Sequence, residues 1–254
     1  MMNSFIRKII KLNSMTLSLL LVLVLIVIFM IGFEYLEVME LKARDFRFKL
    51  RGPIEPGPEV VLAVVDEKSL DRIGRWPWPR SKIADLIRVL DEDGAKVIGF
   101  DIVFGEPDKN TINRRGLKNK AVSRFLAKEL ELADNDLILA KTIAEVKTPV
   151  VLGYFLRIER DKSVAHITPE QIRTQVEQLK NAHYTFARLS SPNVELDQTD
   201  LAQAFMPVAN ILALSKTAAS SGFMNMFQDI DGTVRWIPMV IRLHDKYYLP
   251  LSLQ

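Results

Sequence analysis

Acidic side chains are concentrated between residues 66 and 108 of this sequence, where their types and spacing could support chemistry. Carboxylates gathered above a parallel sheet can hold Mg²⁺ and assist phosphoryl chemistry. No phosphate-binding glycine loop, nucleophile elbow or zinc-ligand spacing accompanies them in the sequence. The alternative is that these acids cap loops and pair with arginines. They are Asp66, Glu67, Asp101, Glu106 and Asp108.

The histidines and one further acidic turn offer little more chemistry. His166, His183 and His244 are isolated and form no HxxxH pair, so neither a histidine metal site nor a triad is predicted. Residues 228–233 (QDIDGT) resemble the start of a calcium loop but lack its later oxygen ligands, and Asp-Gly favours a hairpin turn. We therefore expect no catalytic residue and no metal ion in this segment.

An aromatic and cationic motif, GRWPWPRS, occupies residues 74–81 directly before an amphipathic run. Pro77 and Pro79 restrict the residue before each of them to extended conformations. Trp76 and Trp78 are therefore expected to point to opposite sides, with one indole buried and the other above a crevice.

Two arginines flank these tryptophans. Arg75 and Arg80 can pair with the nearby acids, or they can hold an anionic ligand at the N-terminus of the following helix. The alternative is an aromatic, salt-bridged loop that binds nothing. The residues that form the hypothetical ligand site are Asp66, Arg75, Trp76, Trp78, Arg80, Asp101, Glu106 and Asp108.

Two short apolar runs are predicted to position these side chains. Residues 59–65 (EVVLAVV) and 96–100 (KVIGF) have the composition of strands buried on both faces. Between them, isoleucine and leucine at positions 83, 86, 87 and 90 indicate an amphipathic helix that Gly94 can end. This order predicts a βαβ unit with parallel strands, and ligands bind beyond the carboxyl ends of such strands.

The remaining sequence continues the alternation of helix and strand. Residues 134–136 (Asp-Asn-Asp) can cap a helix with apolar positions 137, 139, 140 and 143, and an apolar strand follows at 148–156. Further helices are expected at 169–183 and 208–219, before three C-terminal strands joined by tight turns. The predicted fold class is therefore α/β, a three-layer domain with a mainly parallel, mixed sheet and a C-terminal antiparallel hairpin.

Residues 15–33 (MTLSLLLVLVLIVIFMIGF) form a run of 19 residues without a charge. A helix of this length covers about 28 Å, close to the thickness of a bilayer's hydrocarbon core. The run exceeds a signal-peptide core and no small-residue cleavage site follows it. Because Arg7, Lys8 and Lys11 precede the run, the N-terminus is predicted to be cytoplasmic and the remainder periplasmic or extracellular. We predict an anchor in the inner (plasma) membrane.

A helical stalk is predicted directly after this anchor, because apolar residues recur there at spacings of 3, 4, 3 and 4. This seam either pairs with a second copy or lies against its own domain, and the proline-rich residues 52–58 end the helix. The seam residues, which we expect to transmit a signal, are Leu36, Met39, Ala43, Phe46 and Leu50. The predicted organisation is a tail at 1–14, a transmembrane helix at 15–33, a stalk at 34–51 and an extracytoplasmic domain at 52–254.

The charge distribution argues against a nucleic-acid partner. The net charge is +3, and the three basic residues of the tail account for all of it, since 34 basic residues less three equals the 31 acidic residues. The body of the chain is therefore balanced and offers no footprint for a phosphate backbone. The sequence contains no cysteine, so no disulfide framework is present.

Several motifs together resemble the type 2 CHASE family, named for cyclases/histidine kinases associated sensory extracellular domain. The resemblance runs from about residue 41 to the last residue and weakens between about 109 and 216. The motifs are LKARDFRF (41–48), VVDEKSL (64–70), IGRWPWPRS (73–81), GAKVIGFDIVFGEPD (94–108) and GFMNMFQDIDGTVRWIP (222–238).

This resemblance implies a sensory domain outside the membrane, followed by further transmembrane helices and a cytoplasmic output domain. We expect the chain to be the sensor portion of a longer adenylate or guanylate cyclase, whose Mg²⁺ and ATP would bind in the cyclase domain and not here. The expected partners are the lipid bilayer, a second copy in a homodimer and an unidentified extracellular ligand. The alternatives are the sensor of a transmembrane protein kinase or a membrane-anchored extracytoplasmic enzyme.

Overall fold

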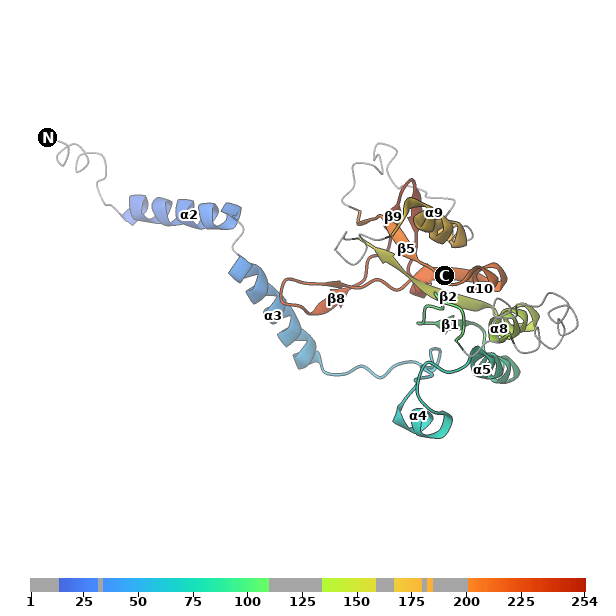
Figure 1. The fold of residues 1–254 in the computed structure, drawn as a ribbon. Helices are drawn as coiled ribbons and strands as arrows, with labels where there is room; N and C mark the ends of the chain where they lie inside the picture. The colour runs from blue at the N-terminus through green and yellow to red at the C-terminus, as the bar shows by residue number, and fades with distance from the viewer. Residues whose placement is uncertain (1–13, 32–33, 110–133, 159–166, 180–181, 185–200) are drawn as a thin grey trace, which may run out of the picture. The chain divides into compact units, whose positions relative to one another are not determined.

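The computed structural model describes residues 14–31, 34–109, 134–158, 167–179, 182–184 and 201–254 (Figure 1). The chain divides into two compact units, which we describe separately. The first combines Met1–Ala63 with Gln228–Thr233, and the second combines Val64–Phe227 with Val234–Gln254.

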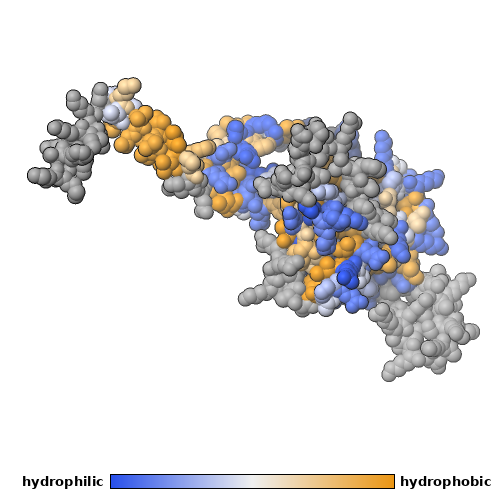
Figure 2. All heavy atoms as spheres, turned by 90° about the horizontal axis from the view of Figure 1, so that it is seen from above, coloured by the Kyte–Doolittle hydropathy of each residue, from blue (hydrophilic) through white to orange (hydrophobic). Residues whose placement is uncertain are grey.

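The first unit contains two helices, α2 (Ser14–Ile31) and α3 (Glu34–Arg51). The apolar side chains of α2 are exposed and form an orange band in Figure 2. Among the described residues, no single helix is long and apolar enough to cross a membrane. Two helical segments are long and apolar enough only when they are taken together, and they are bent by 81° relative to one another: Ser14–Met30 and Tyr35–Arg51. The transmembrane helix at 15–33 therefore remains a prediction.

The helix predicted at residues 34–51 is confirmed as α3, and Gly52 ends it. Gly52 adopts a φ of 74°, and its N–H donates to the carbonyls of Phe48 and Lys49 at 3.2 Å. A positive φ is readily available to glycine, which explains why the helix stops at this residue.

The prediction of a strand at residues 59–65 is wrong. This segment is neither helix nor strand, and Val60, Val61 and Leu62 are 77–84% exposed. Strand propensity describes how well a residue fits a pleated, half-buried surface, and it is realised only where a neighbouring strand pairs. The next regular element is α4 (Glu67–Ile73).

The principal sheet of the second unit is built around β2 (Val150–Arg157). β1 (Ile98–Phe100) and β6 (Ser220–Phe223) pair with it in parallel on opposite edges, since both use Val151 and Leu152 as partners. β5 (Met206–Val208) pairs antiparallel with the C-terminal end of β2.

The predicted mixed sheet is therefore confirmed, but its βαβ unit begins one strand later than expected. It consists of β1, α8 (Asn135–Glu145) and β2. Asp134 caps α8 as predicted, accepting hydrogen bonds from the N–H groups of Asp136 and Leu137.

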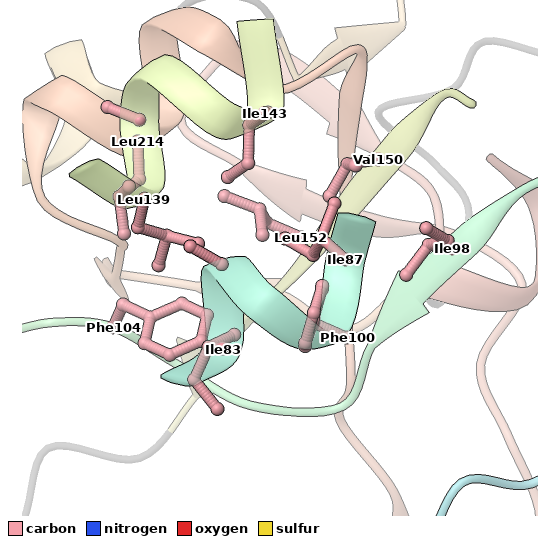
Figure 3. Close-up of a cluster of buried hydrophobic side chains, with 12 residues drawn as sticks. Ile83, Ile87, Ile98, Phe100, Phe104, Leu139, Ile143, Val150, Leu152 and Leu214 are labelled. Carbon is pink, nitrogen blue, oxygen red and sulfur yellow. The ribbon is translucent and has the colours of Figure 1, made fainter. Parts of the chain in front are cut away.

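Three helices pack with this sheet around one apolar cluster (Figure 3): α5 (Arg80–Glu92), α8 and α10 (Leu212–Thr217). Burying each large side chain of such a cluster stabilises the fold by about 1.5–3 kcal/mol. Leu86 and Leu137, predicted to face inward, are instead 37% and 43% exposed. The labelled cluster residues are Ile83, Ile87, Ile98, Phe100, Phe104, Leu139, Ile143, Val150, Leu152 and Leu214.

A second sheet has the strand order β3-β10-β9-β4. The predicted C-terminal antiparallel hairpin is confirmed as β9 (Ile241–Leu243) and β10 (Lys246–Tyr248), with His244 at a φ of 55° in its turn. The two outer strands are β3 (His183–Tyr184) and β4 (Gln203–Ala204).

The remaining described elements are short. They are α9 (Pro169–Gln178), β7 (Phe227–Gln228), β8 (Val234–Trp236) and the 3-10 helix η4 (Leu251–Leu253). The turn between β7 and β8 contains Gly232 at a φ of 79°, as expected for an Asp-Gly hairpin turn. The fold is thus a mixed α/β structure, and its arrangement in three layers remains a prediction.

Candidate ligand pocket

A pocket of about 600 Å³ lies beside the aromatic motif. One wall comes from residues 76–80, which lead into α5, and another from residues 102–109, which follow β1. The pocket therefore lies beyond the carboxyl end of β1, where ligands bind in parallel α/β sheets. Five residues of the hypothetical site line it: Trp76, Trp78, Arg80, Glu106 and Asp108.

The two tryptophans of the motif line this pocket together. Their ring centroids are 5.6 Å apart at an interplanar angle of 69°, an edge-to-face contact. The prediction that they point to opposite sides is wrong, because the Trp78 indole N–H donates to the carbonyl of Gly74 at 2.7 Å and turns the ring back along the chain. Trp78 also packs against the apolar core, whereas Trp76 is 39% exposed.

Arg80 is buried beneath the pocket, and both terminal nitrogens of its guanidinium have a partner. One terminal nitrogen pairs with the carboxylate of Asp136, and the other donates to the backbone carbonyl of Glu106. The guanidinium also lies 5.2 Å from the ring centroid of Phe104. Arg80 therefore positions three segments of the chain and does not present its charge to an anionic ligand.

Asp108 completes this network between the N-terminal ends of α5 and α8. Its side chain accepts hydrogen bonds from the Arg80 backbone N–H and from the Asn135 amide, both at 2.9 Å. Its own N–H donates to Asp136 at 3.2 Å. Carboxylates at helix N-termini are favoured by the helix dipole, so these acids stabilise both helix starts.

Sequence reasoning missed Asp136 as the partner of Arg80. We interpreted residues 134–136 only as helix-capping acids, whereas Asp134 alone provides the cap. The available signal was the second acid in the same turn, which a cap does not require. The predicted alternatives were Asp66, Asp101, Glu106 and Asp108, of which only Asp108 and the backbone of Glu106 contact Arg80.

A buried asparagine holds the segment after β1 that forms one wall of the pocket. Asn210 is 1% exposed, accepts from the N–H of Phe104 at 2.7 Å and donates to the carbonyl of Gly153 at 2.9 Å. The N–H of Ile211 returns to the carbonyl of Phe104 at 2.8 Å. Sequence analysis missed this residue too, although a lone amide inside the apolar run 208–214 was a usable signal.

Three residues of the hypothetical site do not line the pocket: Asp66, Arg75 and Asp101. Asp66 caps α4, where the N–H and hydroxyl of Ser69 donate to it at 2.9 and 2.7 Å. These two hydrogen bonds, the hydroxyl's first, lower the pKa of Asp66. Its expected position depended on the strand at 59–65, which does not form, and Arg75 and Asp101 are exposed.

The carboxylates around the pocket do not assemble a cation site. Among the residues that the structure describes, no group of three His, Cys, Asp or Glu side chains is placed to hold a metal ion. Asp66, Asp108 and Asp136 instead accept hydrogen bonds that fix helix starts and loops.

The second unit is thus a mixed α/β structure with a pocket beyond the carboxyl end of β1. The family model described as CHASE2 domain matches residues 20–254, so the chain belongs to the CHASE2 family, whose members are extracellular sensory domains. No curated protein and no solved structure matches the chain.

Proposed function

We propose that this chain is the extracytoplasmic input domain of a membrane-bound adenylate or guanylate cyclase and that it senses a ligand in the pocket beside the aromatic motif. Its N-terminus would be cytoplasmic and its α/β domain periplasmic or extracellular. The observation that carries the proposal is the pocket itself, which Trp76 and Trp78 line together. It occurs in a chain that belongs to a family of sensory domains. Mg²⁺ and ATP would bind only in the cyclase domain.

The pocket favours a ligand that is uncharged or cationic. Arg80 is neutralised by Asp136, and the other charged lining residues are Glu106, Asp108 and Lys109. Two cations against three carboxylates leave a net charge of −1 around the pocket. The indole rings attract cations through their faces, by about 0.5–2 kcal/mol. Because of this charge balance, we propose an uncharged or cationic ligand instead of the anionic ligand that the sequence suggested.

Signalling requires two states of the domain with different affinities for the ligand. The network of Arg80, Asp108 and Asp136 ties the pocket wall to the starts of α5 and α8. A ligand that displaces the wall would therefore shift the packing of these helices. The stalk α3 is the proposed route from the domain to the membrane.

The ligand class can be tested with three benzyl compounds of different charge: benzyltrimethylammonium, benzyl alcohol and phenylmethanesulfonate. Changing Trp236 to Phe leaves the two pocket tryptophans as the only tryptophan fluorophores, since the chain has three tryptophans. Quenching by the cation at about fivefold lower concentration than by the sulfonate is expected. Tighter binding of the sulfonate would contradict the proposed ligand class.

The output can be tested separately, by measuring cyclic-nucleotide synthesis in membranes that contain the full-length protein. Synthesis of cAMP or cGMP is expected. Protein phosphorylation without nucleotide cyclisation would instead assign the sensor to a kinase and leave the ligand pocket unaffected.

A further inference from the structure

The turn at residues 228–233 belongs to the same compact unit as α3, whereas the chain directly before and after it belongs to the second unit. We propose that this turn couples the ligand pocket to α3. The turn packs on α3 in one signalling state and shifts in the other, so that a bound ligand changes the position of α3. This inference rests on the proposed function, because it assigns the contact that carries the signal.

An ion pair joins the turn to α3. The ammonium of Lys42 lies 3.2 Å from one carboxylate oxygen of Asp231. The Asp231 side chain is 9% exposed, and its other oxygen accepts a hydrogen bond from the N–H of Thr233 at 3.1 Å. Lys42 belongs to the motif LKARDFRF (41–48) and Asp231 to the motif GFMNMFQDIDGTVRWIP (222–238), neither of which lines the pocket. The ion pair therefore gives these two motifs a common role.

One face of α3 is buried around this ion pair. Val38 and Asp45 are half-buried, and Leu41 is 7% exposed. At 3.6 residues per turn, positions 38, 41, 42 and 45 lie within about 100° of one another around the helix axis. The turn is the segment of this unit that comes from the far end of the sequence, and it lies beside α3 in Figure 1. It therefore packs against this face, so apolar burial accompanies the ion pair.

The turn is held together by its own hydrogen bonds. The N–H of Asp229 donates to the carbonyl of Thr233 at 2.9 Å, and the N–H of Gly232 donates to the carbonyl of Asp229 at 2.8 Å. β7 and β8 extend this turn into a two-stranded sheet. A displacement at the base of the hairpin is therefore carried to the turn.

The base of this hairpin packs within the second unit. Phe227 contacts a buried apolar cluster that is separate from the one in Figure 3, and its ring meets the Trp236 ring edge to face, with centroids 5.3 Å apart. The same cluster contains Ala209, whose chain neighbour Val208 lines the ligand pocket. Packed side chains thus lead from the pocket wall to the hairpin, and such contiguous contacts can carry coupling between two sites.

The contact between the turn and α3 is weak enough to exchange between two states. The Lys42 side chain is 60% exposed, and ion pairs of exposed side chains contribute little to stability. Segments that move in signalling are drawn from the least stable parts of a protein. If a ligand shifts the turn, then fixing the turn must change the affinity for the ligand by the same factor.

The turn can be fixed on α3 with a thiol cross-linker. The natural chain contains no cysteine, so Lys42→Cys with Asp231→Cys provides the only two thiols of the 254-residue chain for a short bismaleimide. Arg47→Cys with Asp231→Cys is the matched pair. The first pair is expected to bridge within one chain at least about tenfold faster, because position 47 lies about 140° around the helix from position 42. Equal rates would overturn the contact and the proposal.

The bridged chain is then compared with the same variant whose two thiols are capped singly by N-ethylmaleimide, which carries the same substitutions without a bridge. Calorimetry measures the binding of benzyltrimethylammonium to both forms. Their dissociation constants are expected to differ by about fivefold or more. Equal dissociation constants would overturn the coupling and leave the pocket as a ligand site. Absence of binding to both forms and to the unchanged chain would instead overturn the proposed ligand site, and the coupling with it.

Discussion

The polar network beneath the pocket and the aromatic wall above it differ in how completely their groups are satisfied. Arg80 and Asp136 are each 8% exposed and hydrogen-bonded to one another. On the wall, Trp76 is 39% exposed, and Glu106 is exposed as well. Groups that are already paired stabilise the fold, whereas groups that still face solvent are available to a ligand.

The same contrast occurs between the two arginines of one motif. Arg80 is buried in the network, and Arg75, five residues earlier, is exposed and lies outside the pocket lining. Residue type and proximity in sequence therefore do not determine which arginine is structural. The partner does, and it lies 56 residues away at Asp136.

The largest expected effect comes from breaking the network. Arg80→Ala leaves the buried Asp136 carboxylate without its cation, which costs about 3–5 kcal/mol of unfolding free energy. Denaturant unfolding measures this loss. Arg75→Ala, the matched change at the exposed arginine, should alter stability by no more than about 0.5 kcal/mol. Equal effects of the two changes would contradict the assignment of Arg80 to the fold.

A change at Asn210 tests whether a buried amide stabilises the fold in the same way as the buried ion pair. Asn210→Ala leaves the N–H of Phe104 and the carbonyl of Gly153 unpaired, at about 1–3 kcal/mol for each group. Asn225 makes a similar pair of bonds to the backbone of Leu156, at 2.8 and 2.6 Å, but in a partly buried setting. Asn225→Ala should therefore cost less, because water can replace the amide.

High pH should destabilise a second buried apolar cluster, which contains Tyr154 and Tyr248. Burial, and to a lesser degree Asp245, raise the pKa of Tyr248 to about 12, and burial also raises the pKa of Tyr154 well above its usual value. The unfolded tyrosines ionise near pH 10, so this contribution to stability is complete below pH 10 and is lost as the pH rises toward 12. The slope is about 1.4 kcal/mol per pH unit for each tyrosine.

Urea unfolding at pH 9, 10 and 11 measures this slope, and Tyr248→Phe should make it shallower. A wild-type stability that is constant across this range would show that the tyrosines ionise equally in both states.

The smallest effect is expected for a buried polar group that lacks a partner. The Tyr154 hydroxyl is buried and makes no hydrogen bond to the described residues. Tyr154→Phe removes an unsatisfied group at nearly constant shape, so stability should rise by up to about 1 kcal/mol. Thermal unfolding near pH 7 measures the change, and a loss of 1 kcal/mol or more would show that the hydroxyl is satisfied.

Elements with local signals could be predicted from the sequence. α3 follows from its heptad spacing and Gly52, α8 from its capping acid, and β2 from its apolar, β-branched run. The position of the pocket at the end of β1 was also predictable, since residues 101–108 follow a short apolar strand.

Features that depend on distant partners were not predictable. The run 59–65 has the composition of a strand, but pairing decides whether a strand forms, and β1 pairs with β2 some fifty residues later. Asp136 and Asn210 acquire their roles from Arg80 and Phe104, which lie far away in the sequence. No local pattern reports such contacts.

The central claim, that the aromatic wall is the sensing surface, is tested most directly by cyclic-nucleotide synthesis in membranes containing the full-length protein. Trp76→Ala is compared with Lys141→Ala, an exposed change on α8, at matched expression and folding. Arg80 variants are unsuitable here, because loss of stability would confound their activity. The account predicts that Trp76→Ala alters activity by about fivefold or more while Lys141→Ala leaves it unchanged. Equal activity of wild type and both variants would contradict it.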